Sequence, residues 1–191
     1  MRWRYALGLA LVILVAVGCA TTPTAVGSAA LREGRPADAI AQFEKALADE
    51  PGRLDALIGL GIARYRLGLY DDAIAALGDA VGRAPDQPAA RLYLALASIR
   101  KRDDAKAQEQ LTALHGLPLD PRFAALVDEA IALLHTGPLA DSGRTFLIAS
   151  LDYAAEWSRE VAEMRLQLRQ AQLAWDPFWF RPTYIIRCRN C

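Results

Sequence analysis

Three cysteines are the residues of this 191-residue chain with the most reactive side chains, and two of them form a pair. The chain ends Cys188-Arg189-Asn190-Cys191, a C-x-x-C motif. Redox catalysis at such a pair needs a thiolate held by a helix N-terminus in a βαβ unit, and a zinc site needs two more ligands. The sequence predicts neither site. It supplies no βαβ context for the pair, and His115 and His135 are remote from Cys residues and acidic clusters. We therefore expect a disulfide between Cys188 and Cys191, and no metal, cofactor or catalytic residue. Thiol–disulfide redox activity of the pair is the alternative.

The third cysteine, Cys19, follows an N-terminal segment with the pattern of a signal peptide. Arg2 and Arg4 precede a 12-residue apolar stretch, 6–17. That stretch is too short to cross a bilayer, which needs about 20 residues, and it has the length of a secretory h-region. We predict that 1–18 is a cleaved signal peptide.

The sequence Ala16-Val17-Gly18-Cys19 resembles the lipobox of bacterial lipoproteins, although Ala16 replaces the usual Leu. The resemblance implies a diacylglyceryl group on Cys19 carrying acyl chains such as palmitate, with 19–26 as the lipidated tether. Ala20 follows where Asp would favour retention in the inner membrane, so the resemblance implies the periplasmic face of the outer membrane. Two or more acyl chains give stable anchoring. The alternative to the lipobox is an ordinary signal peptide followed by an incidental cysteine.

Composition excludes several classes of protein and favours helices. Lys and Arg number 22, as do Asp and Glu, so the formal net charge is zero. Electrostatic binding of nucleic acid needs a basic surplus, and we expect no nucleic-acid partner. Hydrophobic residues make up 53% of the chain, which excludes a disordered chain. The 37 alanines favour helix, and the prediction is an all-α fold.

A 34-residue repeat organises the helices. Six residue pairs recur at this spacing: Gly27 and Gly61, Gly34 and Gly68, Ala39 and Ala73, Phe43 and Leu77, Ala46 and Ala80, and Pro51 and Pro85. The pattern resembles the tetratricopeptide repeat, which implies a short αα solenoid over 27–137. A third copy is degenerate, with Arg102 in place of the turn glycine.

Each repeated residue type has a physical reason. Gly61 is small where the two helices of a repeat cross closely, and Ala73 allows the same close approach. Gly68 tolerates the left-handed conformation after a helix end. Pro85 ends the second helix.

Two further helices are predicted after the repeats. Asp120-Pro121 opens a capping helix that ends at Gly137. Within 138–176 we predict a long helix over about 144–175. Its stripe, spaced alternately by four and three residues, consists of Ser150, Ala154, Trp157, Val161, Met164, Leu168, Ala171 and Trp175. We expect it to pack on the solenoid end of the same chain; a homodimer seam is the alternative.

The last segment, 177–191, combines aromatic and basic residues before its C-x-x-C pair. Docking on the chain's own helices is the default expectation, and a lipid interface or a partner surface are the alternatives.

In tetratricopeptide proteins the first helix of each repeat lines a groove for a peptide or partner helix. Carried over by the repeat period, this resemblance implies an apolar floor with a basic rim. The predicted groove residues are Ile58, Ile62, Tyr65, Arg66, Leu92, Tyr93, Leu96 and Arg100. The prediction is a non-catalytic adaptor: an outer-membrane lipoprotein that holds or positions an envelope protein or peptide. A redox factor and a structural homodimer through the long helix are the alternatives.

Overall fold

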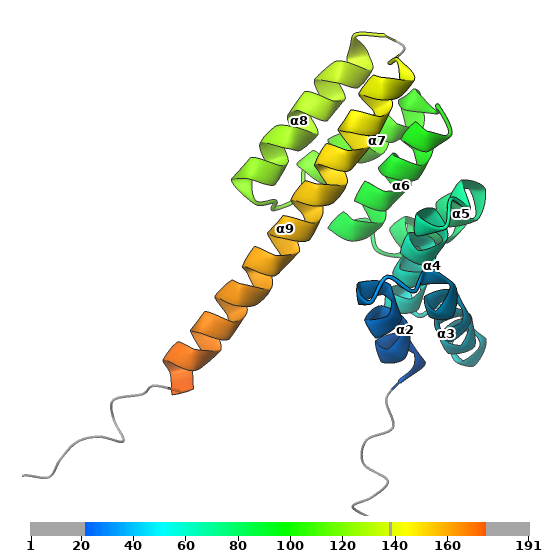
Figure 1. Ribbon diagram of the computed structural model, residues 1–191, viewed down its shortest axis with the longest axis vertical. Helices are drawn as coiled ribbons and strands as arrows, with labels where there is room; N and C mark the ends of the chain where they lie inside the picture. The colour runs from blue at the N-terminus through cyan, green and yellow to red at the C-terminus, as the bar shows by residue number, and fades with distance from the viewer. Residues whose placement is uncertain (1–21, 138, 175–191) are drawn as a thin grey trace, which may run out of the picture.

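The computed structural model describes residues 22–137 and 139–174, and every regular element in these ranges is an α-helix. The helices are α2 (Pro23–Arg32), α3 (Pro36–Asp49), α4 (Leu54–Arg66), α5 (Tyr70–Arg83), α6 (Pro88–Arg100), α7 (Asp104–His115), α8 (Pro121–His135) and α9 (Asp141–Ala174). Consecutive helices from α2 to α7 pack as antiparallel pairs that stack into a short solenoid (Figure 1). The all-α solenoid prediction is confirmed.

The solenoid begins earlier than the sequence pattern predicted. Helix α2 starts at Pro23, whereas the tether was expected to extend to residue 26. The hydroxyl oxygen of Thr22 accepts a hydrogen bond from the Ala25 N–H at 3.3 Å, and proline fits the first helical turn. These two residues form a helix start that the repeat period alone did not show.

The three helix-pair turns share one backbone conformation. Gly34 and Gly68 have φ angles of 72° and 77°, and Arg102 has a φ of 61° at the equivalent place in the third repeat. Positive φ is costly for a residue with a Cβ atom. The third repeat therefore keeps the turn although it lacks the glycine, because the packed helices on either side impose it.

Close helix crossings explain the small residues of the repeat. A Cβ atom added at Gly61 would lie 2.4 Å from Cγ of Leu77, so only glycine fits against that fully buried side chain. Ala73 and Ala80 are also fully buried. The predicted roles of Gly61 and Ala73 are confirmed.

Helix α8 forms the cap that the sequence predicted. The Asp120 carboxylate accepts a hydrogen bond from the Arg122 N–H at 3.1 Å, with Pro121 in the first turn. None of the helices in the described ranges has the length and apolar character needed to cross a membrane.

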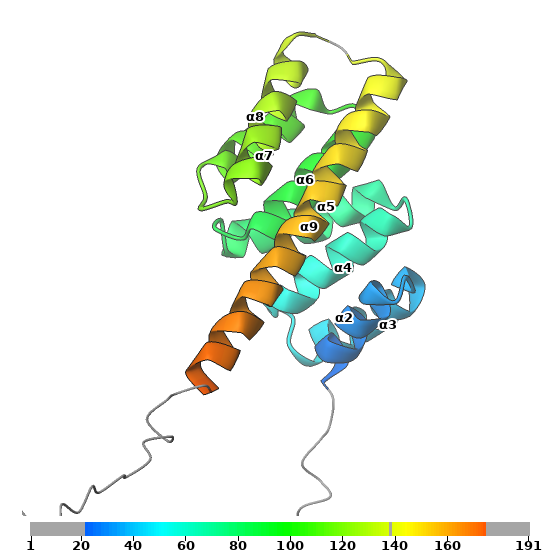
Figure 2. The ribbon, with the colours of Figure 1, turned by 60° about the vertical axis from the view of Figure 1, so that its left-hand side comes forward.

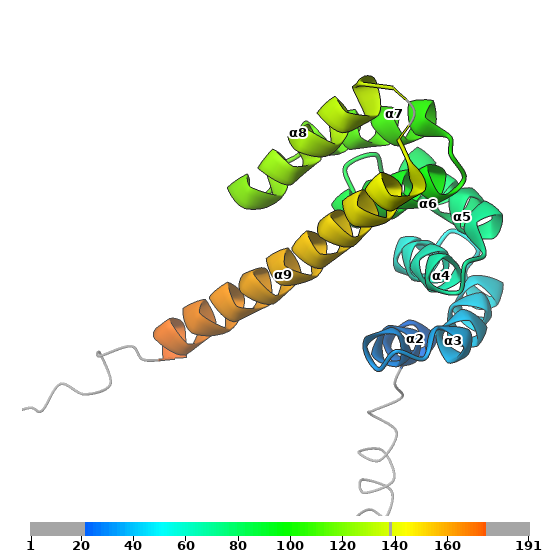
Figure 3. The same cartoon turned by 45° about the horizontal axis from the view of Figure 1, so that its top comes forward.

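Helix α9 is the longest element and runs back along the solenoid (Figures 1 and 2). Its 34 residues span about 51 Å at ~1.5 Å per residue. From the loop after α8 it passes beside α8 and α6 and then extends past the open side of the first repeats (Figure 3). Because of this path, the helix lies over the concave side of the solenoid.

The first half of α9 packs within the chain as expected, but through a different face. The buried apolar residues are Leu147, Ile148, Leu151 and Ala154, and only Ala154 belongs to the predicted stripe. The apolar residues of this segment occupy two faces, and tertiary contact selected the one that α8 and α6 cover. In the second half, Met164 and Leu168 remain 60% and 59% exposed.

Candidate functional site

A cleft lies between the first two repeats and the middle of α9. Its volume is about 610 Å³. The solenoid wall comes from α2 and α4, with the ring of Phe43 from α3 behind them; the opposite wall comes from α9 through Glu156, Arg159, Glu160 and Glu163. Within the described residues, no Cα atom of α9 lies within 8 Å of a Cα atom of α2 or α4. The two walls therefore stand apart at this level of the molecule.

The floor of the cleft is apolar. Leu31, Ile58 and Ile62 are half-buried there. Gly59 lies between them, and a Cβ atom at this position would be 2.3 Å from Cζ of Phe43. Glycine thus allows the Phe43 ring to pack under α4, and the ring forms the bottom of the cleft.

The two walls carry different charges. Arg32 and Arg66 outnumber the single Asp55 on the solenoid side, and three glutamates outnumber the single Arg159 on the α9 side. Arg66 bridges the walls, because one guanidinium nitrogen donates to the Leu31 carbonyl at 2.8 Å and another to Glu156 Oε1 at 3.2 Å. The Glu156 side chain is 53% exposed, so this ion pair is worth about 0–1 kcal/mol.

The structure brings only part of the predicted groove into this cleft. Ile58, Ile62 and Arg66 line it. Leu92, Tyr93 and Leu96 of the third repeat are buried, with Leu96 fully so, and Tyr65 is buried as well. All four belong to the core cluster that also contains Leu147, Ile148 and Leu151 of α9. Four of the eight predicted residues are therefore core residues in this structure.

Tyr93 ties the covered part of the concave face to α9. Its hydroxyl donates a hydrogen bond to Asp152 Oδ1 at 2.9 Å, and its ring meets that of Tyr65 edge-on, with 5.4 Å between centroids. Burial, together with the negative charge of Asp152, raises the pKa of both tyrosines to about 12. Both rings are neutral at physiological pH and act as packing and hydrogen-bonding groups.

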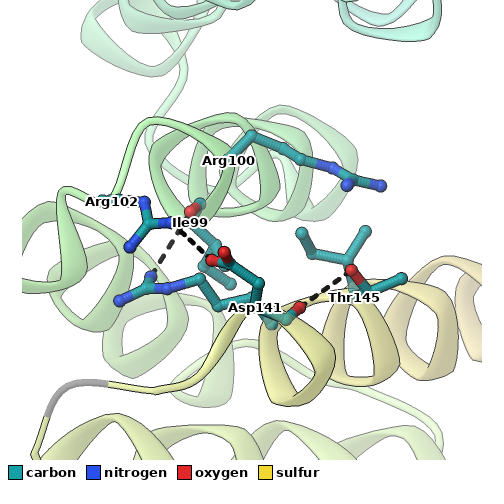
Figure 4. Close-up of a pocket in the computed structure, with 7 residues that line it drawn as sticks. Ile99, Arg100, Arg102, Asp141 and Thr145 are labelled. Atoms are coloured by element: carbon teal, nitrogen blue, oxygen red, sulfur yellow. Dashed lines mark hydrogen bonds and ion pairs between the residues drawn. The ribbon is translucent and has the colours of Figure 1, made fainter.

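The two arginines of the predicted basic rim, Arg66 and Arg100, lie at two different sites. Arg100 lines a separate pocket of about 220 Å³ near the start of α9, beside the ion pair of Arg102 with Asp141 (Figure 4). At the same place the buried Arg144 binds both carboxylate oxygens of Asp104.

These bonds from Arg144 hold the pKa of the Asp104 carboxyl below its ordinary value. The ion pairs Arg102–Asp141 and Arg144–Asp104 join α9 to the α6–α7 turn and to α7.

Sequence reasoning missed the wall that α9 contributes. Its acidic residues, Glu156, Glu160 and Glu163, recur at four and three residues and so share a helix face. That spacing was a usable signal, but the path of α9 across the cleft was not predictable from it.

Several predicted sites lie outside the described residues: the lipid attachment at Cys19, the pair Cys188 and Cys191, and the aromatic tail. Within 22–137 and 139–174 there is no group of three or more His, Cys, Asp or Glu residues that could hold a metal ion.

Comparison with known proteins identifies the repeats. The sequence profile of the tetratricopeptide repeat family matches residues 25–88 and, in a second overlapping copy, 58–121, together more than half of the chain. The chain is a tetratricopeptide repeat protein. A search of curated protein sequences gave no match.

Solved structures similar to this tetratricopeptide repeat protein share its fold. The type III secretion translocator chaperone SycD of Yersinia enterocolitica aligns with a TM-score of 0.53 at 21% identity, covering 60% of this chain and 79% of SycD. SycD in complex with a peptide of the translocator YopD aligns at 0.55 and 20% identity, covering 60% and 90%. An alternative SycD dimer aligns at 0.54 and 20% identity, covering 60% and 89%. A repeat fold of this kind supports a role in protein–protein interaction.

Proposed function

We propose that this protein is a non-catalytic adaptor whose cleft holds a segment of a partner protein. The observation that carries the proposal is the cleft itself, which has an apolar floor and lies open between α2, α4 and α9. The complex of SycD with a YopD peptide supports a peptide segment as the ligand class. Apolar anchors of such a segment would contact Ile58 and Ile62.

We also propose the location that the N-terminal sequence implies. A lipid on Cys19 would anchor the adaptor to the periplasmic face of the outer membrane, and the partner would be an envelope protein. Replacing Cys19 with Ser should release the protein from the outer-membrane fraction or leave the precursor uncleaved. Unchanged fractionation would contradict the anchor and leave the cleft proposal untouched.

A photo-cross-linking residue at Ile62 of the full chain tests the cleft. Irradiation of intact cells should yield an adduct with an envelope protein, identified by mass spectrometry. The second change Ile58→Asp should reduce this adduct by about tenfold or more, since truncated hot spots cost about 2 kcal/mol.

Ile74→Asp is the matched control, because Ile74 is an equally half-buried isoleucine on α5 and lies outside the cleft. It should leave the adduct unchanged. Equal loss in both variants, or no adduct at position 62, would contradict the proposal.

A further inference from the structure

The second half of α9 carries an apolar stripe, most of which no other part of the described chain covers. Trp157 and Val161 are partly exposed, and Met164, Leu168 and Ala171 are exposed. The spacings of four, three, four and three residues place all five on one helix face. Of the eight large hydrophobic residues that are exposed in the described ranges, five lie on α9.

The stripe continues where the chain's own helix pairing ends. Helix α8 covers α9 as far as Trp157, over whose ring the Arg122 guanidinium lies at 5.4 Å from the centroid. Beyond this point no other helix in the described part of the chain packs on α9 (Figure 1). Exposed apolar surface of this extent marks an interaction site.

The charges beside the stripe are segregated. On the side of the cleft lie Glu156, Glu160 and Glu163, with Arg159 paired to Glu156, so this side keeps an acidic surplus. On the other side, at one and five residues after Met164, lie the exposed Arg165 and Arg169. One edge of the stripe is thus acidic and the other is basic.

This arrangement of charges favours a second copy of the chain as the partner, with the two α9 helices parallel. When two copies pair in parallel about a two-fold axis along the helices, the acidic edge of each copy faces the basic edge of the other. In an antiparallel pair each edge faces its own kind, which is repulsive. In the parallel register, Glu160 of each copy lies opposite Arg165 of the other, five residues on, as in the flanking pairs of coiled coils.

We infer that the stripe from Trp157 to Ala171 is the seam of a parallel homodimer. None of the five stripe residues lines the cleft; Glu160 borders both surfaces. Isologous pairing requires the same patch on both copies, and the segregated charges make this patch self-complementary.

Cross-linking within the full chain tests the seam. Two differently tagged copies are co-expressed with a photo-cross-linking residue at position 164, and irradiation should give an adduct of twice the chain mass of 20.8 kDa that carries both tags. A second change, Leu168→Glu, should reduce this adduct by about tenfold.

The matched control is Leu166→Glu. Leu166 is 56% exposed and lies two residues away on the opposite face of the same helix, so its replacement should leave the adduct unchanged. Circular dichroism should give the same melting temperature for both variants, because neither side chain is buried within the chain.

Charge reversal tests the orientation. Glu160→Arg alone and Arg165→Glu alone should each weaken the adduct, and co-expression of the two single variants should restore it between them. An adduct at position 164 with lipid or with another protein alone, equal effects of Leu168→Glu and Leu166→Glu, or no restoration by the mixed pair would overturn the inference. The cleft adduct at Ile62 is measured separately, so failure of the seam and failure of the cleft are distinguishable.

Discussion

The concave face of the solenoid has a closed part and an open part, built from equivalent positions of the repeat. Leu96 on α6 is fully buried in the core cluster to which α9 contributes Leu147, Ile148 and Leu151, whereas Ile62, 34 residues earlier on α4, is half-buried and lines the cleft. Both residues are aliphatic and occupy the same place in their repeats. The difference shows that the path of α9, and not the repeat pattern, decides which part of this face is core and which part is free to bind.

The largest expected effect is a loss of folding stability when a side chain of the closed part is truncated. Leu96→Ala should lower the free energy of unfolding by about 2–5 kcal/mol, because it removes a fully buried side chain and leaves a cavity. Ile62→Ala should cost about 1 kcal/mol or less, since its side chain faces the open cleft. Urea denaturation followed by circular dichroism measures both, and equal losses would show that α9 does not close over α6 in solution.

A smaller effect is expected in the pH dependence of stability, which reports on two buried tyrosines of the closed part. Tyr65 and Tyr93 titrate at about 12 in the folded protein and at about 10 when unfolded. A raised pKa means that the folded state favours the neutral form. Stability from these groups is therefore complete below pH 10 and is lost as pH rises toward 12, on the order of 2–3 kcal/mol for each tyrosine.

Denaturation series at several alkaline pH values measure this loss. The double variant Tyr65→Phe with Tyr93→Phe lacks both groups and should show a flatter dependence between pH 10 and 12. The same steepness in parent and variant would mean that other groups cause the alkaline loss.

The smallest effect concerns the bridge across the open part. Arg66 and Glu156 link α4 to α9 through an ion pair at 3.2 Å. A double-mutant cycle with Arg66→Ala and Glu156→Ala should give a coupling energy of about 0–1 kcal/mol, which decreases with added salt. A coupling well above this range would mean that the bridge holds the cleft shut.

The repeats were predictable because their signals are local. Gly61 and Ala73 allow the two helices of a pair to cross closely, and Gly68 allows the turn between them. The spacing of these residue types therefore predicted the helices and the turns. Arg102 shows the limit of that reasoning, because neighbouring helices impose a left-handed turn on a residue that does not favour it.

The cleft was less predictable because it depends on the relative placement of distant segments. Periodicity correctly placed Ile58, Ile62 and Arg66 on the concave side. It could not show that Leu92, Tyr93 and Leu96 on the same side would be covered, since the covering helix has two apolar faces, one at Leu147 and Leu151 and one at Met164 and Leu168. Choosing between those faces requires the packed structure.

The direction in which α9 runs gives the molecule a polarity. The start of α2 and the end of α9 lie at the same end of the molecule, and the turn between α8 and α9 lies at the other (Figures 1 and 2). The chain therefore enters and leaves the folded unit on one side. A surface that lies against the start of α2 is therefore also on the side where α9 ends, while the α8–α9 turn points away from it.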